Sequence, residues 1–178
     1  MFAKEAARRA AFVSAMLLMI GLAACGDDDP TSPQEEQLAK LRAAVLPFHD
    51  LTSAQQAGYT VVVAHPTSGA TCISDPQLGA MGIHYLNTAL VDDTVIVTQP
   101  ELMIYEPQED GTAKFVAVEY IIPFSIRGED QPAPTLFGET FKQNETFGVW
   151  ALHAWVGEDN PSGTFSDWNP DVSCANAQ

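Results

Sequence analysis

Apolar residues follow a helical period at the start of the folded part of the chain. Beginning at Gln34, four of them recur at helical spacing: Leu38, Leu41, Val45 and Leu46. This spacing places them on one face of a helix, and Pro47 ends the pattern. A second, shorter pattern runs from the capping residue Thr52 to Gly58. The sequence therefore predicts a helix from Gln34 and a second, shorter helix after it.

Beyond Tyr59 the apolar runs become short and rich in β-branched and aromatic residues, which is typical of strands. Such runs occupy residues 60–63, 102–105, 115–122 and 148–156. The turn sequence Glu109-Asp110-Gly111 lies between the second and third runs and predicts a hairpin. Residues 128–143 hold two prolines and predict a long loop. The expected fold class is α+β, with one or two N-terminal helices packed on a curved antiparallel sheet or small barrel.

An uncharged apolar run from Ala10 to Ala24 follows a basic leader and precedes all of these elements. It is shorter than the about 20 residues that a membrane helix needs. It ends at Leu22-Ala23-Ala24-Cys25, directly before a glycine and three aspartates. The segment resembles the signals of bacterial lipoproteins, so we expect residues 1–24 to be a signal peptide and Cys25 to carry lipid. The alternative is an ordinary secreted protein that is cut after Ala24.

Charge and length restrict the partners and the number of domains. The chain has 8 basic and 23 acidic residues, a formal net charge of −15. Such a surface repels nucleic acid and anionic lipid, so we expect no nucleic-acid partner and membrane contact through the lipid anchor. Residues 25–33, rich in aspartate and turn formers, predict a disordered tether after the lipidated cysteine. Residues 34–178 are long enough for a single domain.

Two cysteines remain once Cys25 is assigned to the lipid. Cys72 and Cys174 have no neighbouring cysteine at the spacing of a zinc or redox motif. In an exported chain this pair predicts a disulfide, which would close a loop of about a hundred residues and stabilise the fold by roughly 4–5 kcal/mol. The alternatives are two buried free thiols, or a soft metal such as copper held by both sulfurs.

Three polar residues interrupt the most apolar strands: His84, Glu119 and His153. A buried polar side chain needs a partner. Strand alternation puts Glu119 on the same face as Phe115, and Glu119 and His153 meet if their strands are neighbours in register. With His84 from a third strand, the set predicts a site for a divalent metal, zinc or copper, with open positions for water or a ligand. The alternative is a buried His-Glu-Tyr hydrogen-bond network that fixes the register of the sheet and binds nothing.

The other two histidines lie outside the apolar strands. His49 directly follows the first predicted helix, and it is a candidate for a fourth metal ligand or a general base. Its neighbour Asp50 is expected to start the turn into the second helix. His65 lies before a proline among threonine, serine and glycine, and is expected to be a solvated loop residue. No Gly-x-Ser-x-Gly elbow is present in the sequence, so nucleophilic catalysis has little support.

Several short strings together resemble an uncharacterised family of bacterial exported proteins. They include Met81-Gly82-Ile83-His84-Tyr85, Val118-Glu119-Tyr120, Leu152-His153-Ala154-Trp155, the run 160–163 (Asn-Pro-Ser-Gly), the run 168–170 (Trp-Asn-Pro) and Ser173-Cys174. The resemblance covers nearly all of residues 45–174. It implies the same α+β architecture and a site that includes His49, His84, Glu119 and His153, and it names no reaction.

The sequence thus predicts a membrane-anchored bacterial lipoprotein whose periplasmic or surface-facing domain binds a divalent metal or a small ligand through a His/Glu site. A bound metal could also activate water or bind dioxygen, so an enzyme remains one interpretation. The alternative is a structural or ligand-binding envelope lipoprotein whose buried His-Glu network holds no metal.

Overall fold

The computed structural model describes residues 32–177. The expected signal peptide 1–24, the lipidation site Cys25 and the tether up to residue 31 lie outside the described residues. Among the helices that are described, none is long and apolar enough to cross a membrane.

The first helix, α1 (Pro33–Val45), begins one residue earlier than the predicted start at Gln34. A capping box explains this start. The Ser32 hydroxyl accepts a hydrogen bond from the Glu35 amide (3.2 Å), and the Glu35 carboxylate accepts one from the Ser32 amide (2.9 Å). Three residues of the predicted apolar stripe, Leu38, Leu41 and Val45, face the protein interior, whereas the fourth, Leu46, is 64% exposed and lies beyond the end of the helix. A 3-10 turn, Leu46–His49, follows and carries Pro47 in its first turn.

The second helix, α2 (Leu51–Gln56), is capped by Asp50 and not by Thr52 as predicted. The Asp50 carboxylate accepts a hydrogen bond from the Ser53 amide at 2.7 Å, so the helix starts two residues earlier than expected. This position agrees with the role of Asp50 as the start of the turn between the two helices. The helix ends before Gly58, whose positive φ of 106° permits the turn that follows.

The strands form one large antiparallel sheet and a small two-stranded one. Their bounds are β1 (Val61–Val62), β2 (Cys72–Asp75), β3 (Gly79–Leu86), β4 (Leu102–Pro107), β5 (Ala113–Pro123), β6 (Thr135–Leu136), β7 (Glu139–Thr140), β8 (Lys142–Asn144) and β9 (Val149–Ala154). The large sheet has seven strands in the order β1-β3-β4-β5-β9-β8, and β2 also pairs with β3. The sheet is curved and does not close. Of the two forms that the sequence predicted, the curved sheet is present and the small barrel is not.

Several predicted strands are confirmed, and others differ in length. The hairpin around Glu109-Asp110-Gly111 is β4–β5, and the run 148–156 contains β9. The run 60–63 gives only the two-residue strand β1. The expected loop 128–143 holds the small β6–β7 pair and the start of β8, so it is less irregular than predicted.

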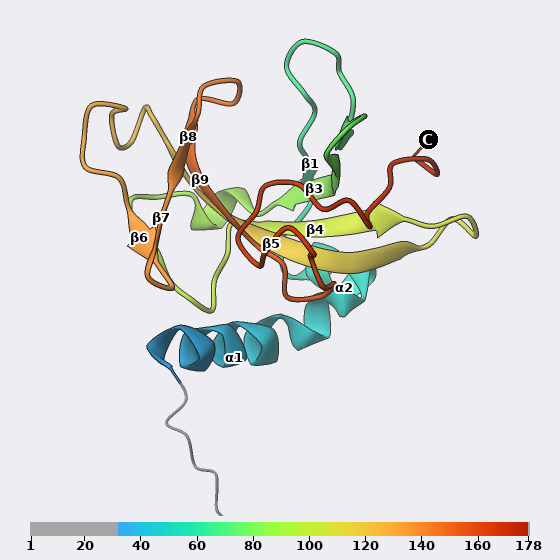
Figure 1. Ribbon diagram of the computed structural model, residues 1–178, viewed down its shortest axis with the longest axis horizontal. Helices are drawn as coiled ribbons and strands as arrows, with labels where there is room; N and C mark the ends of the chain where they lie inside the picture. The colour runs from blue at the N-terminus through green and yellow to red at the C-terminus, as the bar shows by residue number, and fades with distance from the viewer. Residues whose placement is uncertain (1–31, 178) are drawn as a thin grey trace, which may run out of the picture. The chain divides into compact units, whose positions relative to one another are not determined.

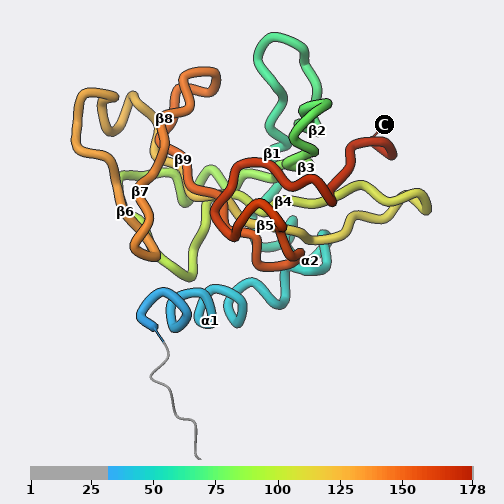
Figure 2. The backbone as a smooth tube through the Cα atoms, in the orientation of Figure 1, coloured from blue at the N-terminus to red at the C-terminus, as the bar shows by residue number. Residues whose placement is uncertain are grey.

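The two faces of the large sheet have different covers. The helices α1 and α2 lie against one face (Figure 1) and enclose the main core, to which Met103, Tyr105 and Val118 contribute from the strands. The C-terminal segment, red in Figure 2, runs back to the sheet, where Asn169 pairs with Ala80 of β3. It closes a second, smaller apolar cluster on the other face. The predicted disulfide between Cys72 and Cys174 is present, with a Cα–Cα distance of 5.7 Å, and ties this segment to β2.

Candidate metal centre

Three strands of the large sheet supply the three polar residues that the sequence singled out. His84 lies on β3, Glu119 on β5 and His153 on β9. Glu119 and His153 are direct partners in the antiparallel register, as predicted for neighbouring strands. His84 comes from one strand further away, because β4 lies between β3 and β5. The structure therefore brings together all three residues, on the face of the sheet opposite the helices.

The side chains of this triad approach one another through both ring nitrogens of His153 and both oxygens of Glu119. His84 Nε2 lies 3.4 Å from His153 Nε2 and 3.6 Å from Glu119 Oε2, and His153 Nδ1 lies 3.5 Å from Glu119 Oε1. With one donor atom taken from each residue, the three atoms lie within 4.8 Å of one another. Tetrahedral ligands held about 2.0–2.1 Å from a zinc ion lie roughly 3.3 Å apart. The triad therefore gathers three possible ligands in one place, and its side chains would draw closer together around an ion.

Burial sets the protonation of all three residues. His84, Glu119 and His153 are 4%, 7% and 3% exposed. Burial lowers the pKa of His84 to about 3, with a further contribution from His153, and lowers the pKa of His153 to about 3. Burial also raises the pKa of Glu119 to about 8, and the carboxylates of Asp167 and Glu101 add to this rise. Both imidazoles are therefore neutral at pH 7 and have lone pairs available to a metal.

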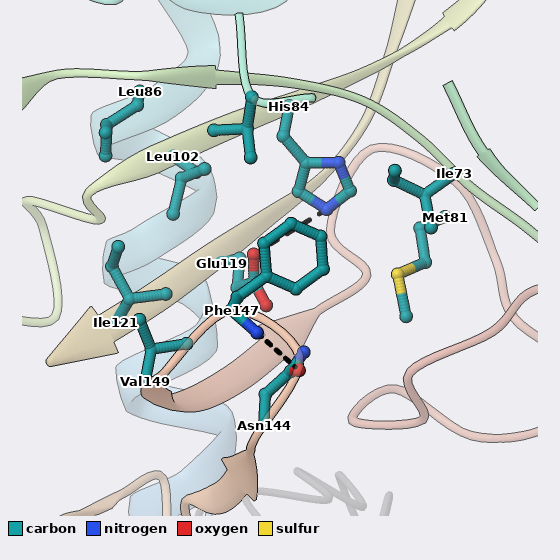
Figure 3. Close-up of a pocket in the computed structure, with 11 residues that line it drawn as sticks. Ile73, Met81, His84, Leu86, Leu102, Glu119, Ile121, Asn144, Phe147 and Val149 are labelled. Atoms are coloured by element: carbon teal, nitrogen blue, oxygen red, sulfur yellow. Dashed lines mark hydrogen bonds and ion pairs between the residues drawn. The ribbon is translucent and has the colours of Figure 1, made fainter. Parts of the chain in front are cut away.

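Two hollows meet at the triad. The inner cavity has a volume of about 180 Å³ and reaches His84 and Glu119, as Figure 3 shows. The outer one, about 470 Å³, reaches Glu119 and His153 and has a charged rim that includes Lys142 and Asp167. These two rim residues form an ion pair of 2.8 Å. An ion held by the triad would keep coordination positions that face open space, which is the arrangement of catalytic and ligand-binding metal sites.

His49 does not belong to this group. It is exposed, and its ring stacks on Phe115 with a centroid distance of 4.6 Å. Phe115 belongs to the core that the helices cover, whereas Glu119 faces the opposite side of the sheet. The predicted placement of Phe115 and Glu119 on one face is wrong because the β4–β5 register shifts between Ile104 and Tyr105. His49 lies in the turn between the two helices and therefore on the far side of the sheet from the triad.

Sequence reasoning missed the residues that cover the triad from outside. Phe147, in the turn between β8 and β9, lines both hollows, and Asn144 accepts a hydrogen bond from its amide at 3.3 Å. His65 is in a loop, as expected, but it is half-buried, lines the outer hollow and makes an edge contact with the Phe147 ring at 5.9 Å. No local motif marks these positions. They reach the triad only through the pairing of β8 with β9 and the path of the loop before β2.

Comparison with known proteins adds no relative, because no family model, no curated protein and no solved structure matches this chain. The functional interpretation therefore depends on the geometry of the triad and on the sequence that precedes the described residues.

Proposed function

We propose that the protein is a lipid-anchored envelope protein whose exported domain binds one first-row divalent metal ion through His84, Glu119 and His153. Two imidazoles and one carboxylate suit zinc, copper or iron, and intrinsic affinity favours copper over zinc. Three protein ligands leave coordination positions for water or a small ligand. The lipoprotein part of the proposal comes from the basic leader, the apolar run and Cys25, and the disulfide is consistent with an exported protein.

The single observation that carries the metal proposal is the spacing within the buried triad. A hydrogen-bond network made for structural purposes would have donor–acceptor distances of about 2.7–3.2 Å. The two contacts of Glu119 with the histidines are longer, at 3.6 and 3.5 Å. Three buried polar groups that satisfy one another poorly are costly unless a further group lies between them.

Elemental analysis of the purified protein tests this function. We expect about one equivalent of a first-row metal per chain after reconstitution, and loss of that metal in His84→Ala, His153→Ala and Glu119→Gln. When one of the three ligands is removed, the two that remain bind the ion too weakly to retain it during buffer exchange. The matched control is His49→Ala, because His49 is exposed and lies on the other face of the sheet. That variant should keep its metal.

A structural network predicts the opposite pattern. The wild-type protein would then take up no stoichiometric metal under any loading condition, and the three triad variants would differ from it only in thermal stability. Equal metal content in His84→Ala and His49→Ala would also overturn the proposal.

A further inference from the structure

The inner cavity beside the triad has an apolar wall interrupted by one polar patch. Its wall is made by side chains from several strands and from the β8–β9 turn, among them Val63, Leu86, Ile121, Phe147 and Val149. His84 and Glu119 lie next to each other in this lining, with Leu102 and Ile121 on one side and Ile73 and Met81 on the other, as Figure 3 shows. Asn144 is the remaining polar residue of the lining, and its carbonyl oxygen is already used by the Phe147 amide. The cavity therefore favours a molecule with one polar end and an apolar body.

The size of the cavity limits that body. A volume of about 180 Å³ belongs to the class that holds one benzene-sized molecule, since a dry apolar cavity of about 150 Å³ is known to bind benzene. A body of about six carbon atoms fits such a space. Sugars and nucleotides are disfavoured, because their hydroxyl and phosphate groups would lose water without finding partners on this wall.

The charge at the metal site determines which polar group the ligand should carry. With two neutral imidazoles and one carboxylate as ligands, a divalent ion keeps a net charge of +1 at a site whose three side chains are buried. A single negative charge on the incoming group neutralises this excess, and a carboxylate is a hard oxygen donor that zinc, iron and copper accept. An ammonium head would be repelled by the ion and could not coordinate it.

We propose that the inner cavity binds a small monocarboxylate, whose carboxylate coordinates the metal ion held by the triad while its hydrocarbon body fills the apolar space. This inference rests on the proposed metal site and adds the ligand class to it. The body is either a short aliphatic chain or a single aromatic ring, and both have the required combination of charge and apolar volume.

The test uses the purified protein loaded with Co²⁺, whose visible absorption reports a change of ligands. Titration with acetate, butanoate, hexanoate and benzoate should change the spectrum, and the affinity should rise about fourfold for each methylene buried between acetate and hexanoate. Hexylammonium has the same body with the opposite charge and should leave the spectrum unchanged. A higher affinity for hexanoate than for benzoate would indicate an aliphatic body, and the reverse order would indicate an aromatic one.

Cavity-filling variants locate the binding site. Val63→Phe and Leu86→Trp add bulk to the wall, so each should keep the Co²⁺ spectrum and the acetate affinity but lose at least tenfold in hexanoate affinity. The matched control is Val62→Phe, because Val62 is 40% exposed and lines a different hollow together with Tyr85. The control should bind hexanoate like the wild-type protein. The retained Co²⁺ spectrum shows that each variant is folded.

The outcomes separate the two proposals. If the protein takes up no Co²⁺, the metal site itself is wrong and the ligand proposal fails with it. If Co²⁺ binds but hexanoate is no tighter than acetate, or hexylammonium binds equally well, the ligand proposal alone is overturned. Unchanged hexanoate affinity in both Val63→Phe and Leu86→Trp would overturn it as well.

Discussion

Glu101 is a buried carboxyl group that serves the backbone and not the metal triad. It is 3% exposed, and one of its oxygens accepts a hydrogen bond from the amide of Ile121 on β5 at 3.1 Å. Burial raises its pKa from 4.5 to about 7, and the hydrogen bond from Ile121 acts in the opposite direction. Near neutral pH this residue therefore changes charge inside the folded protein.

This shift predicts how the stability of the protein depends on pH. Because the folded-state pKa lies above the unfolded value, the native state holds a proton that the unfolded chain loses between pH 4.5 and about 7. The contribution of Glu101 to the free energy of unfolding should fall as pH rises through that window, by at most about 1.4 kcal/mol per pH unit, and stay level above it. The buried imidazoles of His84 and His153, whose pKa values are lowered, contribute in the opposite direction.

Glu101→Gln should remove this dependence. The amide oxygen of glutamine can still accept the hydrogen bond from Ile121, and no charge is buried at high pH. We expect the variant to be more stable than the wild-type protein at pH 8 by on the order of 2 kcal/mol, and about equally stable at pH 4.5. Urea unfolding at both pH values checks this. Parallel pH profiles for the two proteins would contradict it.

At the scale of elements, Gly82 is the point where β3 can approach β4 closely. Its φ is 109°, in the left-handed region that side chains avoid. A Cβ atom at this position would lie 2.8 Å from the carbonyl oxygen of Tyr105, which is backbone and cannot turn away. Gly82 precedes His84 by two residues in β3. The close approach of the two strands therefore also fixes the backbone position from which the His84 side chain projects.

Gly82→Ala should therefore destabilise the fold and disturb the triad. We expect a loss of roughly 2–3 kcal/mol, because the substitution combines backbone strain with a backbone clash. The control is Gly111→Ala at the hairpin tip, which also has a positive φ (80°) but no atom within 4 Å of the added Cβ. It should cost only about 1 kcal/mol. Urea unfolding of both variants gives the comparison, and equal losses would show that the approach of β3 to β4 is not tight.

The elements that sequence patterns predict well are those with strong local signals. The stripe of α1 and the turn at Glu109-Asp110-Gly111 give the right helix face and the right hairpin. A bulge has no comparable signal, so strand alternation places Phe115 on the wrong face beyond the register shift. The pairing of Glu119 with His153 could be inferred because each is a polar residue in an otherwise apolar strand. The assignment of His49 to the site failed because adjacency in sequence says nothing about which face of the sheet a loop reaches.

At the scale of the whole molecule, the disulfide holds two distant parts of the chain together. Cys72 and Cys174 are 102 residues apart, and the C-terminal segment between β9 and Cys174 has little regular structure of its own. Non-covalent contacts also hold it, among them the Ala80–Asn169 bridge, the hydrogen bond from the Ser173 amide to Glu106 (2.9 Å) and the burial of Val172 in the second apolar cluster. The covalent link therefore adds to these contacts by restricting the unfolded chain.

Replacing both cysteines by serine should lower the free energy of unfolding by roughly 4 kcal/mol, because the unfolded chain regains the freedom of a long loop. Urea unfolding of the double variant measures the loss, and the wild-type protein under reducing conditions should show a similar one. A loss below about 1 kcal/mol would mean that the other contacts suffice to hold the segment.

Cys25→Ser tests the proposed anchor. Cys25 lies outside the described residues, and its lipidation is proposed from the leader and the apolar run before it. The intact protein should fractionate with membranes and carry the mass of attached lipid, whereas the variant should be released. A variant that stays with the membrane, together with an unmodified wild-type mass, would falsify the anchor.

The division of the sheet into a helix-covered face and a face that carries the triad has an evolutionary consequence. His84, Glu119 and His153 lie on the face opposite the main core that the helices cover, so substitutions of these side chains leave the apolar packing under the helices in place. Substitutions around the triad can accumulate while the chain still folds. A descendant of this protein could therefore exchange one ion for another, or one small molecule for another, in few mutational steps, and a laboratory library confined to the triad and the cavity wall should be rich in folded members.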